Sequence, residues 1–258
     1  MRIAVPISAS EAQEVLVQAR AALAAGADII EFRTDYLQDL SSERVASLIE
    51  KIRGLGPDTA LIVTCRDVRE GGAREYPAHL RAEILKTAIE HNAEFIDCEF
   101  RNFCAEALRE TLGSALQQHP TTRLILSAHH FSGPFPDLKQ QYQDIRCSWP
   151  TAIPKLVYTA QHINDCFEAF DLLHQTEGDR IVLCMGQASL ISRVMACMFG
   201  GFLTFASLGE AKATAPGQPT IGQVRDLFPP EGPGSQTQLF GIIADPVSHS
   251  LSPALHNA

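Results

Sequence analysis

Short apolar runs alternate with amphipathic stretches along most of the chain. The runs are rich in Ile, Val, Leu and Phe and predict strands, and the stretches between them have helical spacing. Helix-start signals support this pattern: a capping box of Ser10 and Gln13, the serines Ser41 and Ser42, and Pro77 at a first turn. The predicted strands begin near residues 3, 29, 60, 95, 123, 153, 181 and 202.

Eight strand–helix units in about 225 residues predict a closed (β/α)₈ TIM barrel of the α/β class. A doubly wound dinucleotide fold is the alternative, but no Gly-x-Gly-x-x-Gly follows a predicted strand and no Walker loop is present. In a barrel the active site lies where the strands end, so polar residues at those ends are the candidates.

The composition changes after Leu227, where a stretch rich in Pro and Gly begins. Such a stretch reads as a linker, and a new apolar run follows it, too short to form a domain. We therefore expect a barrel domain over 1–227, a linker over 228–238 and the truncated start of a second α/β domain over 239–258.

Composition narrows the classes of partner. The 258 residues carry a net charge of −9 with no Lys/Arg-rich run, which argues against nucleic acid and anionic membranes. No apolar stretch reaches the roughly 20 residues of a membrane helix, and no signal peptide is visible. The seven cysteines form no C-x-x-C pair, so we expect reduced core thiols in a cytoplasmic protein.

Lys155 lies inside a predicted buried strand, Ile153 to Tyr158. An unpaired ammonium is costly to bury, so an apolar setting would favour a neutral amine that can attack a carbonyl. This predicts a Schiff-base enzyme. A strand lysine with an exposed head is the structural alternative.

Strand alternation selects further candidates, because residues i and i+2 share one face. His129 shares its face with Ser127, whereas His130 continues an apolar face directed at the helices, so we favour His129. Each residue also has a structural alternative, such as an ion pair of Glu31 with Arg33 or Arg66. No metal-ligand spacing is present. The pairs expected to face the barrel mouth are Glu31 with Arg33, Thr64 with Arg66, Ser127 with His129, and Leu183 with Met185.

Together these residue types describe imine chemistry. A lysine imine withdraws electrons, a histidine moves a proton on the neighbouring carbon, and arginines bind an anionic, hydroxylated substrate. Dehydratases and aldolases share this chemistry, and residue types alone do not separate them.

Six motifs, in order, resemble the type I 3-dehydroquinate dehydratases of the shikimate pathway, a family of aromatic amino acid biosynthesis. The resemblance extends over residues 1–225. The motifs are Glu31-Phe32-Arg33-Thr34-Asp35, Thr64-Cys65-Arg66 with Glu70-Gly71-Gly72, Ser127-Ala128-His129, Ile153-Pro154-Lys155, Met185-Gly186 with Ser192-Arg193, and Ala215-Pro216-Gly217-Gln218.

The resemblance implies a role for each matching residue. Lys155 would form the imine with the ketone of 3-dehydroquinate, His129 would move the proton, and Glu70 would orient His129. Arg193 would bind the substrate carboxylate, and no external cofactor is implied. The remaining substrate-binding residues would be Glu31, Arg33 and Arg66 at the ring hydroxyls, with Met185, Phe205, Thr214 and Gln218.

Three positions depart from the family pattern. His130 stands where Asp is usual, Leu183 where Met is frequent, and Thr214 where Ser is usual. The loop over 209–218 has the small residues of a lid, and we expect it to be mobile without ligand.

The tail, residues 241–257, is similar to the opening of a shikimate dehydrogenase. Ser250 and Ser252 match the serine pair that binds the shikimate carboxylate in that family. We expect a longer bifunctional parent, with NADP needed only by its missing dehydrogenase domain, and no dehydrogenase activity in this chain. A tail without its domain would be flexible or docked on a neighbour.

Members of the dehydratase family often dimerise, so a homodimer is a further expectation. Two other functions stay open: a class I aldolase on the same barrel, and a catalytically silent barrel that scaffolds a dehydrogenase domain.

Overall fold

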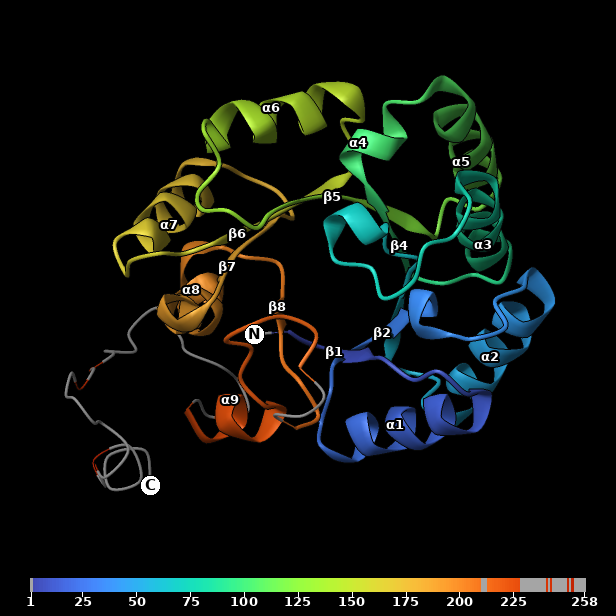
Figure 1. Ribbon diagram of the computed structural model, residues 1–258, viewed down its shortest axis with the longest axis horizontal. Coiled ribbons are helices and arrows are strands. Elements are labelled where there is room, and N and C mark those ends of the chain that lie inside the picture. The colour runs from blue at the N-terminus through green and yellow to red at the C-terminus, as the bar shows by residue number, and fades with distance from the viewer. Residues whose placement is uncertain are drawn as a thin grey trace.

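Eight parallel strands follow one another around a nearly closed barrel, and the helices lie outside them (Figure 1). This computed structural model describes residues 2–209 and 213–227, together with residues 240, 242, 250 and 252. The predicted (β/α)₈ barrel is confirmed. The strands are β1 (Ile3–Ile7), β2 (Ile29–Arg33), β3 (Ala60–Thr64), β4 (Phe95–Glu99), β5 (Arg123–His130), β6 (Ile153–Thr159), β7 (Ile181–Met185) and β8 (Thr204–Phe205).

The strands pair in the order β7-β6-β5-β4-β3-β2-β1-β8. Each of these strand pairs is parallel. Ser127 on β5 lies between Glu99 on β4 and Lys155 on β6. Strand β8 begins two residues after the predicted position. The delay follows from the turn at Gly200 and Gly201, where φ is 87° at Gly200 and a Cβ on Gly201 would meet the Ala196 carbonyl oxygen at 2.8 Å.

The helices connect successive strands and cover the barrel on its outside (Figure 1). Their apolar faces and the outward residues of the strands form one continuous buried core. The helices are α1 (Ala12–Ala24), α2 (Ser42–Leu55), α3 (Ala78–Glu90), α4 (Phe100–Phe103), α5 (Glu106–Gln118), α6 (Leu138–Ser148), α7 (Asp165–Gln175), α8 (Leu190–Met195) and α9 (Ile221–Leu227), and the 3₁₀ turns are η1 (Thr34–Tyr36), η2 (Val68–Glu70), η3 (Gln187–Ser189) and η4 (Ala196–Phe199).

Two of the three predicted helix starts are confirmed. The Ser41 hydroxyl accepts a hydrogen bond from the Arg44 backbone N–H, and α3 begins directly after Pro77. The capping box of Ser10 and Gln13 is wrong. Helix α1 begins one residue later, after Glu11, and no side chain caps it, while the Ser10 carbonyl accepts the backbone N–H of Gln38 instead.

The cysteines are only partly the core thiols that we expected. All seven are free, and Cys65, Cys98, Cys166 and Cys184 are buried. Cys104 and Cys147 are exposed because they lie on the outer helical layer, so for these two the expectation is wrong.

Several expectations fall outside the described residues. These are the linker over 228–238, almost all of the segment 239–258, and residues 210–212 of the expected lid. Within the described part of the chain, no helix has the length and apolar character to cross a membrane.

Candidate active site

Lys155 occupies the centre of the barrel mouth, on β6. Its side chain is buried, with the residue 4% exposed, so the alternative of an exposed head is wrong. The apolar setting that we expected is also wrong: Nζ donates to Asp97 Oδ2 at 2.7 Å and lies 3.8 Å from Glu31 Oε1. The ring of Phe205 covers it, with Nζ 4.3 Å from the ring centroid. Carboxylates surround this amine because the inward residues of β2 and β4 are acidic.

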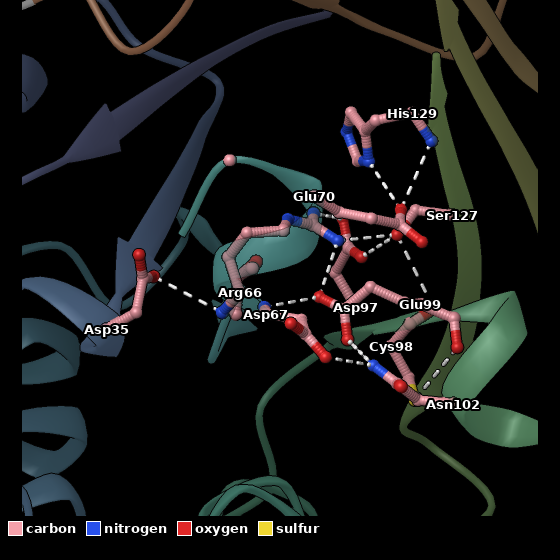
Figure 2. Close-up of polar contacts among 12 residues, drawn as sticks. Asp35, Arg66, Asp67, Glu70, Asp97, Cys98, Glu99, Asn102, Ser127 and His129 are labelled. Carbon is pink, nitrogen blue, oxygen red and sulfur yellow. Dashed lines mark hydrogen bonds and ion pairs between the residues drawn. The ribbon is translucent and has the colours of Figure 1, made fainter. Parts of the chain in front are cut away.

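Asp97 and Glu99 contact the site residues Lys155 and Arg66, and sequence reasoning missed both. Asp97 accepts hydrogen bonds from Arg66 Nη2 at 2.8 Å and from the Ser127 hydroxyl at 2.6 Å (Figure 2). It also accepts the Lys155 hydrogen bond described above. Burial opposes its charge, but Arg66 and Lys155 hold the pKa of Asp97 well below its ordinary value. Asp97 and Glu99 lie at positions i and i+2 of the otherwise apolar strand β4, so they share one face. This alternation, which selected the other candidates, was the signal that could have found both.

His129 and Glu70 form a hydrogen-bonded pair at the mouth. Glu70 Oε2 lies 3.0 Å from His129 Nδ1 and accepts the backbone N–H of His129 at 3.1 Å (Figure 2). Burial, with Arg66 and Lys155 nearby, holds the pKa of His129 well below 6.5, so the imidazole is neutral at neutral pH. An ionised Glu70 fixes the proton on Nδ1 and leaves Nε2 free to accept one. The pair can therefore act as an oriented general base.

His130 points away from the pocket, as the strand phase predicts. Its Nδ1 lies 2.8 Å from the Gly133 carbonyl oxygen and its ring stacks on Phe135, between β5 and α6. His130, which stands where the family usually has Asp, therefore contacts the loop after β5 and not the pocket. In that loop Phe131 stacks over the His129 ring at 6.3 Å between centroids.

Arg33 and Glu31 extend the site toward β2. Asp35 binds Arg33 through both oxygens at 2.8 Å, and it also accepts the backbone N–H of Ala73 at 2.9 Å. Glu31 accepts the Thr64 hydroxyl at 2.9 Å and faces Lys155, so the ion pair with Arg33 or Arg66 considered from the sequence is replaced by these contacts.

Arg193, on α8, is a buried guanidinium without an acidic partner in the described part of the chain. The residue is 2% exposed and its Nε makes no hydrogen bond there. Burial lowers the pKa of Arg193 to about 10, which leaves it charged at neutral pH. A buried charge without a counter-ion is costly, so this position favours an anionic ligand.

The segment from Thr214 to Gln218 closes one side of the pocket. Gln218 Oε1 accepts the Thr214 backbone N–H at 2.9 Å, and the Pro216 carbonyl accepts the backbone N–H of Gly186. Gly217 has a φ of 73°, and a Cβ there would meet the Gly186 carbonyl oxygen at 2.2 Å. Only glycine allows this close contact.

All of the candidate dehydratase residues line one cavity of about 90 Å³, a size suited to a small molecule. Its lining also includes Leu183, which was expected to face the barrel mouth, and Gly71 of the Glu70-Gly71-Gly72 motif. Phe131 and Val157 line it too, and sequence reasoning did not select them. The candidates in the lining are Glu31, Arg33, Arg66, Glu70, His129, Lys155, Met185, Arg193, Phe205, Thr214 and Gln218.

The serine pair of the tail is only sparsely described. The backbone N–H of Ser252 donates to Ser250 Oγ at 3.3 Å. The residues around them lie outside the described part, so the carboxylate-binding role of this pair stays a prediction.

A comparison with protein families decides the assignment. The family described as "Type I 3-dehydroquinase" matches residues 3–230. The chain belongs to this family. The resemblance found in the six motifs is confirmed.

Individual relatives agree with the family. A protein of Arabidopsis thaliana named bifunctional 3-dehydroquinate dehydratase/shikimate dehydrogenase, chloroplastic, is 31% identical over 99% of this chain, which spans 41% of that relative's length. A 3-dehydroquinate dehydratase of Methanococcus maripaludis is 31% identical, with 88% of this chain and 98% of the relative covered. The solved structure of the 3-dehydroquinate dehydratase from Aquifex aeolicus is 28% identical, with a TM-score of 0.75 over 89% of this chain and all of that one.

Proposed function

We propose that this chain converts 3-dehydroquinate to 3-dehydroshikimate and water through an imine on Lys155. The observation that carries the proposal is that one small cavity is lined by a buried lysine, an oriented neutral histidine and a buried arginine that has no acidic partner among the described residues. Membership of the type I 3-dehydroquinase family supports the same reaction. A Schiff base of this kind needs no external cofactor, because the imine itself is the electron sink.

The reaction balances with the groups present. The Lys155 ammonium loses one proton and its nitrogen adds to the substrate ketone, that proton and a second one from the nitrogen leave with the carbonyl oxygen as water, and the product is a protonated imine. His129 Nε2 removes the C2 proton, and the electron pair moves into the imine to form an enamine. The pair then returns, the C1 hydroxyl leaves with the proton carried by His129, and hydrolysis restores Lys155 and releases the enone product. One water is lost overall.

The surrounding charges suit this sequence. His129 begins neutral and becomes cationic when it takes the proton, and the Glu70 carboxylate at 3.0 Å stabilises that cation. Asp97 holds Lys155 in place through a 2.7 Å contact, which orients Nζ in the cavity. The proton is therefore moved by a base whose partner is already positioned.

Substrate binding follows from the charged and apolar side chains that line the cavity. Arg193 would bind the carboxylate, because it lacks an acidic partner in the described part of the chain. Glu31, Arg33 and Arg66 would hold the ring hydroxyls. Met185 and Phe205 would pack on the apolar ring faces, and Thr214 with Gln218 would close over the substrate.

The experiment that tests the function is a turnover assay with 3-dehydroquinate, followed by the absorbance of the conjugated enone. We expect the wild-type chain to produce the enone and Lys155→Ala to produce none. An aldolase would form no such product, and a silent barrel would show no turnover in either protein. Full turnover by Lys155→Ala would contradict the imine mechanism.

We also propose that residues 239–258 begin a shikimate dehydrogenase-like domain after a linker at 228–238. The plant relative, whose name joins the two activities and which matches 99% of this chain, supports this. NADP would then serve only that domain, with Ser250 and Ser252 at its substrate carboxylate. A homodimer and a cytoplasmic location are our further predictions, to be tested by light scattering and by cell fractionation.

A further inference from the structure

Glu99 is a fully buried carboxylate, 1% exposed, that the reaction above does not use. Each of its oxygens accepts two hydrogen bonds. Oε1 accepts Arg66 Nη1 at 2.9 Å and the backbone N–H of Asp67 at 3.0 Å. Oε2 accepts Asn102 Nδ2 at 2.8 Å and Arg81 Nη1 at 3.1 Å. Its acceptor capacity is therefore fully occupied.

These four donors come from three different parts of the chain that meet at the barrel mouth. Figure 2 shows Arg66 and Asp67, which follow β3, and Asn102 on α4. Arg81 lies on the outer helix α3. Arg81 also pairs with Asp67 at 3.0 Å, so Glu99, Arg81 and Asp67 form one buried network. The network continues to Arg69 through Asp67 and to Asp97 through Arg66. Such a buried network resists displacement of any one member.

Asp67 begins the turn η2 that carries Glu70. Its carbonyl oxygen accepts the backbone N–H of Glu70 and of Gly72, both at 2.9 Å, and its side chain accepts the backbone N–H of Arg69 at 2.9 Å. Because Glu99 holds the backbone N–H of Asp67, the position of the turn depends on Glu99. The same Glu99 oxygen holds Arg66, which lines the cavity.

We propose that Glu99, which is absent from the described lining of the cavity, is a positioning residue that aligns Arg66 with the Glu70 turn and acts on Glu70 through its charge. The proposal rests on the proposed dehydratase function. It assigns to Glu99 two effects, one geometric and one electrostatic. The second effect separates it from a residue that only stabilises the fold.

The charges that face Glu70 give the electrostatic effect a direction. Burial raises the pKa of Glu70 to about 7, Arg66 lowers it, Glu99 and Asp97 raise it, and the His129 backbone N–H lowers it. Activity needs ionised Glu70, so it falls as the pH drops through the Glu70 pKa. Loss of the Glu99 charge should therefore extend activity to lower pH.

The test compares three variants of the full chain, with kcat/KM for enone formation measured across pH. Glu99→Gln keeps the side-chain shape but removes the negative charge and presents an amide NH₂ to two donors. Arg81→Gln removes a positive charge on the far side of Glu99. Asn102→Ala is the matched control, because it removes one neutral donor to Glu99 and one to Asp67 without changing any charge.

We expect Glu99→Gln to lower kcat/KM at its optimum pH by about 10- to 100-fold. The acid limb, which is the part of the pH profile where kcat/KM falls as the pH drops, should move to lower pH. Arg81→Gln should move the acid limb to higher pH, because Glu99 is then less neutralised. Asn102→Ala should leave the limb at its wild-type position. Circular dichroism reports whether each variant folds.

An unmoved limb in folded Glu99→Gln, or a shift of all three variants in one direction, overturns the proposal. If Glu99→Gln does not fold, the proposal is tested by comparing the pH profiles of Arg81→Gln and Asn102→Ala. An acid limb at the same pH in these two variants overturns the proposal. Absence of enone formation by the wild-type chain is a different result, since it refutes the proposed function itself.

Discussion

Glu70→Gln should separate stability from activity in this protein. The carboxyl has a pKa of about 7, raised from an ordinary 4.5 chiefly by burial, and its side chain is 6% exposed. The rise of about 2.5 at 1.36 kcal/mol for each pKa unit means that ionised Glu70 costs the folded state about 3 kcal/mol. This loss of stability accompanies a functional role, because the ionised carboxylate orients His129.

The sign of the pH dependence follows from the raised pKa. Below pH 4.5 Glu70 is protonated in both the folded and the unfolded chain, so it does not lower the free energy of unfolding there. As the pH rises from 4.5 to about 7, the unfolded chain releases its proton first, so the free energy of unfolding falls through this window. Glutamine cannot ionise, so Glu70→Gln removes this loss.

The assay is urea unfolding of wild type and Glu70→Gln at pH 5 and pH 8. The fall in unfolding free energy between these two pH values should be smaller in the variant by about 2 to 3 kcal/mol, since part of the loss precedes pH 5. Dehydration by the variant should be at least about 100-fold slower, because His129 loses its charged partner.

A conservative control is Glu110→Gln on α5, where the side chain is exposed. This variant should keep the wild-type pH dependence of stability. An identical pH dependence in Glu70→Gln and wild type, or equal destabilisation of Glu70→Gln at both pH values, would refute the reasoning.

Three further substitutions test separate parts of the structure. Arg193→Met should raise KM by about 100-fold with a smaller effect on kcat, measured by steady-state kinetics, because it removes a cavity cation that has no acidic partner in the described part of the chain. Asp97→Asn should lower the free energy of unfolding by about 3 to 5 kcal/mol in urea, because Lys155 and Arg66 lose their shared carboxylate. Ser41→Ala should cost about 1 kcal/mol of stability and leave the kinetics unchanged, because it removes only the cap of α2.

The barrel could be predicted from the sequence because its strands are buried on both faces and its repeats are regular. Seven of the eight strand starts coincide with the predicted positions, and β8 starts two residues late. The failure at the start of α1 has a local cause. Ser10 has the right residue type for a cap, but its backbone is held by Gln38 and the helix begins beyond it.

The site was predictable to the extent that strand alternation decides it. Alternation placed Glu31, Arg33 and His129 on the inward face, and the cavity contains them. The same rule, applied to β4, would have found Asp97 and Glu99. The other features of the site depend on which elements meet in space, and the order of residues does not give this. They are the contact of Asp97 with Lys155 and the lack of a described partner for Arg193.

The most direct test of the imine is reduction with borohydride in the presence of 3-dehydroquinate, followed by mass spectrometry of the peptides. We expect a stable substrate adduct on the peptide that contains Lys155, and no adduct in Lys155→Ala or when substrate is omitted. Active wild-type protein with no adduct, or with the adduct on another lysine, would contradict the mechanism.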